Sequence, residues 1–330
     1  MVDGVFLQKL FFAEKPAVAR AISIVENQDE SSIELLEAVH DRLGRAYRVG
    51  ITGPPGAGKS TIVSKLARAF DDAHVKVGII AVDPTSPFKG GALLGDRVRM
   101  MELSSRNGIF IRSMATRGSM GGLSGSTQQA ADVLDAAGYD FILLETVGVG
   151  QSELDIVEAA DTTVVVLTPE SGDSIQAMKA GLMEIADFFV LNKADRPGVN
   201  QSFSAITTVL SLRGSNNIVP PPEEISSKQN KSENAWHPFI VKSVASENKG
   251  IDEIVKGIEK HRDYLRRTEL LLTKRKERIR RMIIELVDRS LHDRCWNKER
   301  LSELDDKLEL VISHKLSAHR LAKEIVERPL

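Results

Sequence analysis

The sequence predicts an α/β protein with a mostly parallel, doubly wound sheet and with helical extensions at both ends. Between residues 47 and 250, short β-branched runs alternate with helical stretches, which is the pattern of strand–helix–strand units. Several of these runs are apolar at consecutive positions, as expected for strands that helices cover on both faces. These two observations predict the fold class without any reference to function.

Residues 1–46 are predicted to form two helices that precede the sheet. Pro16 suits the first turn of a helix over "AVARAISIVEN", because the N–H that proline lacks has no partner there. Ser31 or Ser32 could cap a second helix over "IELLEAVHDRL".

The predicted strands are rich in β-branched and aromatic residues, and they cover residues 47–52, 75–83, 108–115, 139–146, 162–169, 187–193 and 238–245. Residues 214–237 are rich in Asn, Pro, Ser and Glu, and they predict a long loop. After Gly250 apolar residues recur at helical spacing almost to the end. We therefore expect an N-terminal helical segment over 1–46, an α/β domain over 47–250 and a C-terminal helical extension over 251–330.

The composition excludes several classes of protein. The chain has 44 lysines and arginines against 46 acidic residues, a net charge of −2, so nucleic acid is not an expected partner. The single cysteine, Cys295, excludes an intramolecular disulfide framework and fits a reducing compartment. No apolar run approaches the roughly 20 residues that cross a bilayer, and the first residues lack a signal pattern. We expect a cytoplasmic protein with no membrane partner.

A glycine-rich segment between the first predicted strand and the following helix matches G-x-x-x-x-G-K-[ST]. Its backbone N–H groups and the helix N-terminus attract phosphate, so an ordinary Gly/Pro turn is the weaker interpretation. Lys59 should reach the β- and γ-phosphates, the Ser60 hydroxyl should ligate Mg²⁺, and Thr61 should lie near the α-phosphate. The predicted phosphate loop comprises Gly53, Pro54, Pro55, Gly56, Ala57, Gly58, Lys59, Ser60 and Thr61.

The segment "NKAD" at the end of a later predicted strand indicates which base the nucleotide carries. The Asp195 carboxylate could accept hydrogen bonds from guanine N1–H and the N2 amine, donors that adenine lacks at that edge. Lys193 would stack its stem on the base, and Asn192 would tie this loop to the phosphate loop. Backbone contacts to guanine O6 are expected from Ser243, Val244 and Ala245.

Acidic residues at two other strand ends are expected to serve Mg²⁺ and the γ-phosphate. Asp83 ends "IIAVD", and Glu145 begins "ETVG", in which the Gly148 N–H could detect the γ-phosphate. The residue after Gly148 is Val149, where Ras-like GTPases carry a water-orienting glutamine, so hydrolysis without a partner should be slow. Between Asp83 and Glu145, charged residues in a glycine-rich stretch could reach the nucleotide or be solvated surface; they are Asp96, Arg97, Arg99, Arg112 and Arg117.

Taken together, GPPGAGKST, AVDPTSP, ETVGVGQSE, PESGDSIQ and NKAD resemble the MeaB/MMAA (ArgK-like) GTPases over most of residues 45–270. The resemblance implies a P-loop NTPase fold and Mg²⁺-dependent hydrolysis of GTP to GDP. It also implies a chaperone that gates cofactor loading and protection of an adenosylcobalamin-dependent acyl-CoA mutase, typically methylmalonyl-CoA mutase. The family forms homodimers, for which the C-terminal extension is the expected element, and it also carries the label of an LAO/AO (arginine/ornithine) transport system ATPase or kinase.

The resemblance assigns further roles by position. Asp83 belongs to the metal site, Asp96 to a first switch, and Glu145 with Gly148 to a second switch. Residues 169–181, "PESGDSIQAMKAG", would form a third switch that couples the nucleotide to the mutase through Gln176 and Lys179.

Two rival functions remain open from the sequence alone. A nickel-delivery GTPase would need a histidine-rich or cysteine-containing site, whereas the seven histidines are scattered at no tight ligand spacing. A kinase of a transport system would need an acceptor site with a nearby base, and the sequence offers no clear candidate.

Overall fold

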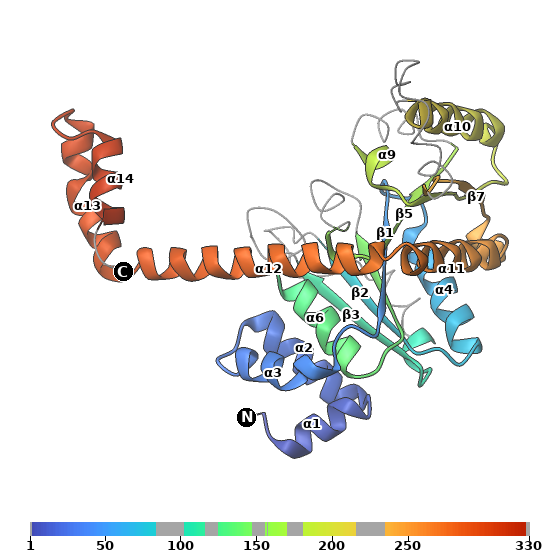
Figure 1. Cartoon of the computed structure of the whole chain (residues 1–330), viewed down its shortest axis with the longest axis horizontal. Coiled ribbons are helices and arrows are strands. Elements are labelled where there is room, and N and C mark those ends of the chain that lie inside the picture. Colours follow the sequence, from blue (N-terminus) through green and yellow to red (C-terminus); the bar gives the residue numbers. More distant parts are fainter. Residues whose placement is uncertain are drawn as a thin grey trace, which may run out of the picture. The chain divides into compact units, whose positions relative to one another are not determined.

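The computed structural model (Figure 1) describes residues 2–83, 102–115, 125–146, 156, 158–169, 181–215 and 235–327. By its contacts the chain divides into two compact units, Met1–Leu272 and Thr273–Leu330. The first unit contains the N-terminal helices, the sheet and the first helix after Gly250.

A single parallel sheet of seven strands forms the centre of the first unit. Each observed strand lies within one of the predicted runs, and every pairing between them is parallel. The predicted doubly wound α/β fold is therefore confirmed. The strand order is β3-β2-β4-β1-β5-β6-β7, with β1 (Tyr47–Thr52), β2 (Val77–Asp83), β3 (Ile109–Ala115), β4 (Phe141–Thr146), β5 (Thr162–Leu167), β6 (Phe188–Leu191) and β7 (Ile240–Lys242).

Helices cover both faces of the sheet because alternate strand residues are apolar on each side. On β5, Val164 and Val166 belong to one buried cluster, and Val165 and Leu167 to another. One face packs against α4 (Lys59–Asp72) and α11 (Ile251–Arg267). The other face packs against α6 (Gly125–Ala136) and the N-terminal helices and, toward β6, against α9 (Leu182–Ile185) and α10 (Val199–Ser215).

The N-terminal segment contains one helix more than predicted. The two predicted helices are present as α2 (Lys15–Asn27), with Pro16 in its first turn, and α3 (Ser32–Val39), which a 3₁₀ turn over His40–Arg42 follows. An additional helix, α1 (Gly4–Phe11), precedes them. The Asp3 carboxylate accepts a hydrogen bond from the Phe6 N–H at 2.8 Å, which satisfies one of the unpaired donors of the first turn. Phe6 and Leu10 are buried, so packing stabilises a helix too short to be stable alone.

The apolar spacing predicted helices after Gly250 but not their number, and the residues described there contain four. They are α11 (Ile251–Arg267), α12 (Leu270–Cys295), α13 (Lys298–Ile312) and α14 (Ala318–Glu327). Glu269, at a φ of 60°, interrupts the helix between the first two, and the Asn297 side chain caps the third by accepting from the Arg300 N–H at 2.9 Å. None of the helices in the described ranges is both long and apolar enough to cross a bilayer.

Candidate functional site

The predicted phosphate loop leaves the carboxyl end of β1, between β4 and β5. Two of its glycines cannot be replaced without a clash. Gly53 has a φ of +136°, and a Cβ there would lie 2.1 Å from the Val166 carbonyl oxygen. Gly58 is the N-cap of α4 at a φ of +89°, and a Cβ would lie 2.4 Å from the Asn192 amide nitrogen. The glycines therefore allow close approach of the loop to its neighbours, as well as the left-handed backbone.

Lys59 folds back over this loop. It is the first residue of α4, its side chain is buried, and its ammonium donates to the Gly53 carbonyl oxygen at 2.6 Å and the Pro54 carbonyl oxygen at 3.0 Å. An ammonium has three donors, so Lys59 can donate to a phosphate as well as to the loop. Because the loop carbonyls hold it in place, a phosphate bound to the loop's N–H groups would have a cation beside it. The charge is thus positioned by the loop itself before any ligand binds.

Two of the predicted magnesium ligands are in direct contact. The Ser60 hydroxyl, at the start of α4, donates to the Glu145 carboxylate at 2.5 Å, and Glu145 is a buried residue near the end of β4. Asp83 is the last residue of β2, the strand beside β4. A hydroxyl and a carboxylate are the hard oxygen donors that Mg²⁺ prefers, so the residues present fit that ion. No cluster of three or more histidine, cysteine or acidic side chains suited to a metal occurs in the described ranges.

A second hydroxyl contact, on the opposite face of the sheet, joins the end of β4 to the end of β1. The Thr146 hydroxyl donates to the Thr52 hydroxyl at 3.0 Å, and both residues are buried. Thr52 directly precedes the phosphate loop, and Thr146 directly follows Glu145. Sequence reasoning missed this pair, although a threonine at the end of each of two apolar strands is a weak signal for it.

The "NKAD" segment lies next to the phosphate loop, as the base-site prediction requires. The Asn192 side chain is buried, and its amide donates to the Ala57 carbonyl oxygen at 2.9 Å. The side-chain oxygen of Asn192 accepts from the Ser243 hydroxyl and from the Ala245 N–H, both at 3.1 Å. One amide therefore connects three segments of the chain at the carboxyl ends of β1, β6 and β7.

The other residues of the base site surround Asn192. Lys193 has a φ of +57°, so the chain turns sharply after β6, and the Ala194 N–H donates to the Ser243 carbonyl oxygen at 3.0 Å. Asp195 is exposed at this turn. Glu247, with a smaller contribution from Asp195, raises the pKa of Lys249 above its usual value. Val244 and Ala245 lie at the start of the turn that follows β7.

Several predicted site residues lie outside the described ranges. They are Asp96, Gly148, Gln176 and Lys179, with Val149, Arg97, Arg99 and Arg117. Arg112, in contrast, lies on β3, where its guanidinium contacts Glu26 and Ser23 of α2. In this structure Arg112 therefore connects the sheet to α2 rather than facing the phosphate loop.

Comparison with known proteins gives the arrangement a family. The model of the "Methylmalonyl Co-A mutase-associated GTPase MeaB" family matches residues 18–300. A Pyrococcus abyssi protein that carries GTPase in its name is 47% identical over 287 residues, which cover 87% of this chain and 84% of the relative. The GTPase ArgK of Escherichia coli is 35% identical over 252 residues, which cover 75% and 72%.

A solved structure supports the same assignment at the level of the fold. The crystal structure of an LAO/AO transport system kinase is 25% identical and superposes with a TM-score of 0.67 over 99% of this chain and 98% of its own. With a matched family model, relatives named as GTPases, and a phosphate loop whose buried neighbours come from the ends of β4 and β6, the chain belongs to the MeaB family and is a GTP hydrolase.

Proposed function

We propose that the chain is a Mg²⁺-dependent GTPase that acts as a chaperone of an adenosylcobalamin-dependent acyl-CoA mutase, most closely of the methylmalonyl-CoA mutase type. The description of the matching family supports the partner. The observation that carries the nucleotide chemistry is the Asn192 amide, which holds the base segment against the phosphate loop. Hydrolysis of GTP to GDP would change what the mutase contacts, and so gate loading and protection of its cofactor.

The proposed roles follow from position and chemistry. The N–H groups of Gly53 to Thr61 bind the phosphates, and Lys59 neutralises the charge that develops on the β- and γ-phosphates. Ser60 and Glu145, with Asp83, would hold Mg²⁺, which supplies charge stabilisation at the transferred phosphate. Asp195 pairs with the guanine donors, while Asn192 and Ser243 keep the base loop in place.

Unassisted hydrolysis is expected to be slow. Val149 stands where a water-orienting glutamine would serve in Ras-like proteins, and a side chain without a hydrogen-bonding group cannot orient water. We propose that the mutase speeds turnover through the switch residues Asp96 and Gly148, and that residues 169–181, with Gln176 and Lys179, carry the nucleotide state to the partner.

A homodimer is the proposed assembly, with a second copy covering α12. None of the residues of this helix is buried, and from Ile279 onward its exposed apolar side chains are mostly three or four residues from another of the set: Ile279, Ile283, Ile284, Leu286, Val287 and Leu291. Such a stripe is one face of a helix, and an exposed apolar patch of this kind marks an interaction surface.

A turnover experiment tests the proposal. GTP hydrolysis is measured with and without a purified adenosylcobalamin mutase, and the mutase is captured by the chain loaded with GDP or with a non-hydrolysable GTP analogue. Stimulated turnover and nucleotide-dependent capture are expected. A phosphorylated product would instead favour a kinase activity, for which the similar solved structure is named, and the absence of both effects would refute the chaperone role.

The guanine assignment has its own test. Asp195→Asn should reduce the preference for GTP over ATP by about tenfold or more, because an amide cannot accept from both guanine donors. Competition binding of the two nucleotides measures the ratio, and Asp252→Asn, an exposed residue in the first turn of α11, is the control. An unchanged ratio would refute the role of Asp195.

A further inference from the structure

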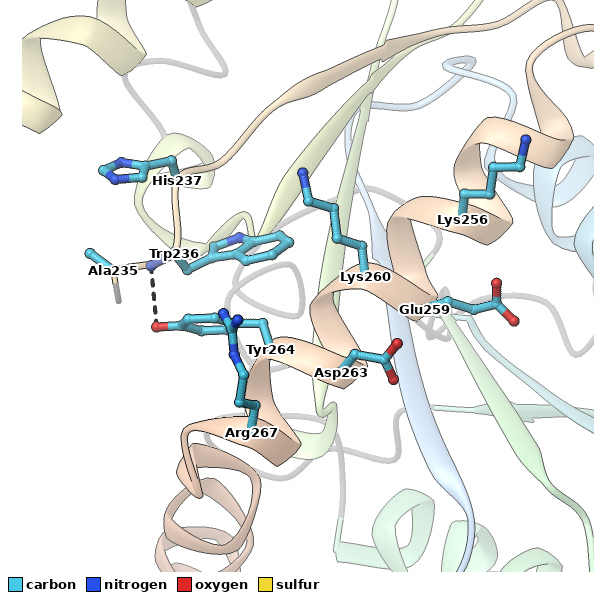
Figure 2. A pocket seen from close by; sticks show the side chains of 9 residues that line it. All are labelled: Ala235, Trp236, His237, Lys256, Glu259, Lys260, Asp263, Tyr264 and Arg267. Atoms are coloured by element: carbon cyan, nitrogen blue, oxygen red, sulfur yellow. Dashed lines mark hydrogen bonds between the residues drawn. The ribbon is translucent and has the colours of Figure 1, made fainter. Parts of the chain in front are cut away.

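A cavity of about 650 Å³ lies away from the phosphate loop, between α11 and the segment that leads into β7. Figure 2 shows the residues that line it, among them Trp236, Lys256, Lys260, Tyr264 and Arg267. Trp236 lies four residues before the start of β7. The cavity therefore opens near the amino ends of the strands, whereas the nucleotide residues lie at the carboxyl ends. Its volume falls in the range of small-molecule sites.

Partly buried hydrogen bonds hold the aromatic wall of this cavity in one orientation. The Trp236 indole N–H donates to the Asp187 carbonyl oxygen at 2.6 Å, and its backbone N–H donates to the Tyr264 hydroxyl at 3.2 Å. The two rings lie 5.1 Å apart between centroids. The Asp187 carboxylate accepts from the Thr163 N–H at 2.7 Å and lies 3.3 Å from Nε2 of the buried His261.

The polar chain continues into the sheet. His261 Nδ1 lies 2.8 Å from the Thr162 hydroxyl, which is 2.6 Å from the Tyr47 hydroxyl. Both N–H donors of Trp236 are thus used within the protein, and what its ring offers a ligand is a fixed aromatic surface. Binding of a flat apolar group to such a surface costs little free energy for ordering side chains, because the ring is already held in place.

Three cations, Lys256, Lys260 and Arg267, line the cavity beside the aromatic wall. Lys256 and Lys260 lie four residues apart on α11, where like charges repel by a few tenths of a kcal/mol. The Lys260 ammonium lies 5.9 Å from the centroid of the Trp236 ring and 5.2 Å from that of Phe239. Within the part of the chain that the structure describes, no hydrogen bond or ion pair joins the side chains of Lys256, Lys260 or Arg267 to another residue.

Two carboxylates, those of Glu259 and Asp263, also line the cavity, and the Asp263 carboxylate lies 3.9 Å from the Arg262 guanidinium. In Figure 2 the carboxylates of Glu259 and Asp263 project on the side of α11 away from Trp236, whereas Lys260 extends on the same side as the indole. We propose that the cavity binds an organic anion that carries a planar ring, with the ring against Trp236 and the carboxylate or phosphate group at Lys260, and with Lys256 adding positive charge one helical turn away.

Two strands connect this cavity to the base site, a link that rests on the proposed guanine role of Asn192 and Ser243. Asp187 directly precedes β6, and Asn192 directly follows it; the segment of Trp236 leads into β7, and Ser243 directly follows that strand. Asp187 and Asn192 flank the four residues of β6, so they are separated by roughly 16 Å along the strand. A ligand that shifts the wall would change nucleotide exchange, and the effect would be reciprocal.

Tryptophan fluorescence tests the binding. Trp296→Phe leaves Trp236 as the one tryptophan of the chain, and the variant is loaded with GDP and Mg²⁺ so that the base site is filled. Adenosine 5′-monophosphate and benzoate are the anionic probes, and adenosine and inorganic phosphate supply the ring or the charge alone. A saturable change with at least one anionic probe is expected, with a Kd about tenfold below that for adenosine or phosphate. Saturation by one anion alone identifies its phosphate or carboxylate as the group that binds, and saturation by both shows that the site accepts either group.

Variants locate the site. The double variant Lys256→Gln/Lys260→Gln should weaken the anionic probe by about tenfold, the loss of a charge-assisted contact, and Lys9→Gln on α1 should leave its affinity unchanged. No saturable change with either anion, or equal affinity in the double variant, would overturn the proposal. A failure to load GDP would instead count against the nucleotide site.

The link between the sites is measured separately. The rate of GDP release with saturating anion should differ by about fivefold from the rate without it, and the double variant should remove the difference. An unchanged rate in the presence of a bound probe would overturn the coupling while leaving the binding site in place.

Discussion

Individual residues at the carboxyl edge of the sheet act by connecting distant segments. Asn192 contacts the phosphate loop, Ser243 and Ala245 with one amide, and Gly58 is a glycine partly because that amide approaches within 2.4 Å of where a Cβ would lie. The Lys59 ammonium donates to two carbonyl oxygens of the same loop and gives the loop a positive charge. A change at any of these residues alters the loop's shape or its charge, so each has a distinct expected effect.

Lys59→Ala should abolish measurable GTP binding, a loss of about 100-fold or more in affinity, because the phosphates would lose the cation beside the loop. Isothermal titration with GTP and Mg²⁺ measures this. The variant should remain folded, since alanine keeps the first turn of α4. Lys65→Ala on the same helix is the control, and retained tight binding in Lys59→Ala would refute the phosphate-loop assignment.

Buried tyrosines make stability depend on alkaline pH. Burial raises the pKa of Tyr139 to about 12, and it also raises the pKa of Tyr47. In the unfolded chain a tyrosine ionises near pH 10, so the unfolded state loses its protons first as the pH rises. The stability contributed by each buried phenol is therefore complete below pH ~10 and is lost as the pH rises through the folded pKa.

The free energy of unfolding should thus fall between pH 9 and 12 by an amount on the order of 2 kcal/mol from Tyr139. Urea unfolding at several pH values measures the fall, and Tyr139→Phe should make it smaller. An equal fall in the variant would show that other groups cause the alkaline loss of stability.

At the scale of elements, the carboxyl end of β4 contacts α4 on one face of the sheet and the end of β1 on the other. The Ser60–Glu145 contact lies on one face and the Thr52–Thr146 contact on the other, with Ile51 and Glu145 in register between the strands. The phosphate loop leaves one of these strand ends, and the segment that contains Gly148 leaves the other.

The packing of α11 against the sheet depends on a glycine. A Cβ on Gly257 would lie 3.2 Å from the rings of Phe188 and Phe239, so a larger residue there would push the helix or the rings apart.

Either Thr52→Val or Thr146→Val should lower the free energy of unfolding by about 1–2 kcal/mol, because each leaves one buried hydroxyl without this partner. The double variant replaces both hydroxyls by methyl groups of the same shape, so it should lose less than the sum of the single variants, by about 1 kcal/mol. Urea unfolding of all four proteins measures the coupling. Additive losses would mean that the two hydroxyls do not stabilise each other.

At the scale of the whole molecule, the exposed apolar face of α12 is the surface that a partner would cover. The unit from Thr273 to Leu330 buries few residues of its own; Arg300, Leu321 and Ile325 are those that the structure shows as buried. A unit with so small a core is stabilised by association when a partner is present.

Ile283→Glu should therefore convert the proposed dimer to a monomer, because it places a charge in the middle of the apolar stripe. Light scattering after gel filtration measures the mass, and Arg280→Ser, an exposed charged residue on the same helix, is the control. GTP binding by the variant should be unchanged, since the phosphate loop belongs to the other unit. A wild-type chain that is monomeric at high concentration would contradict the proposed assembly.

Local patterns in the sequence determined the seven strands, the phosphate loop and the order of the motifs, because alternation, consecutive apolar runs and glycine spacing act over a few residues. They also led to the family, which the comparisons confirm. Only the tertiary structure decided the strand order and the contact between Ser60 and Glu145, 85 residues apart. The motifs predicted that Asn192 would contact the phosphate loop, and the structure identified its partner there as the Ala57 carbonyl oxygen. It also decided that α1 forms and that an open cavity lies between Trp236 and α11, since such features depend on packing between segments that no local pattern brings together.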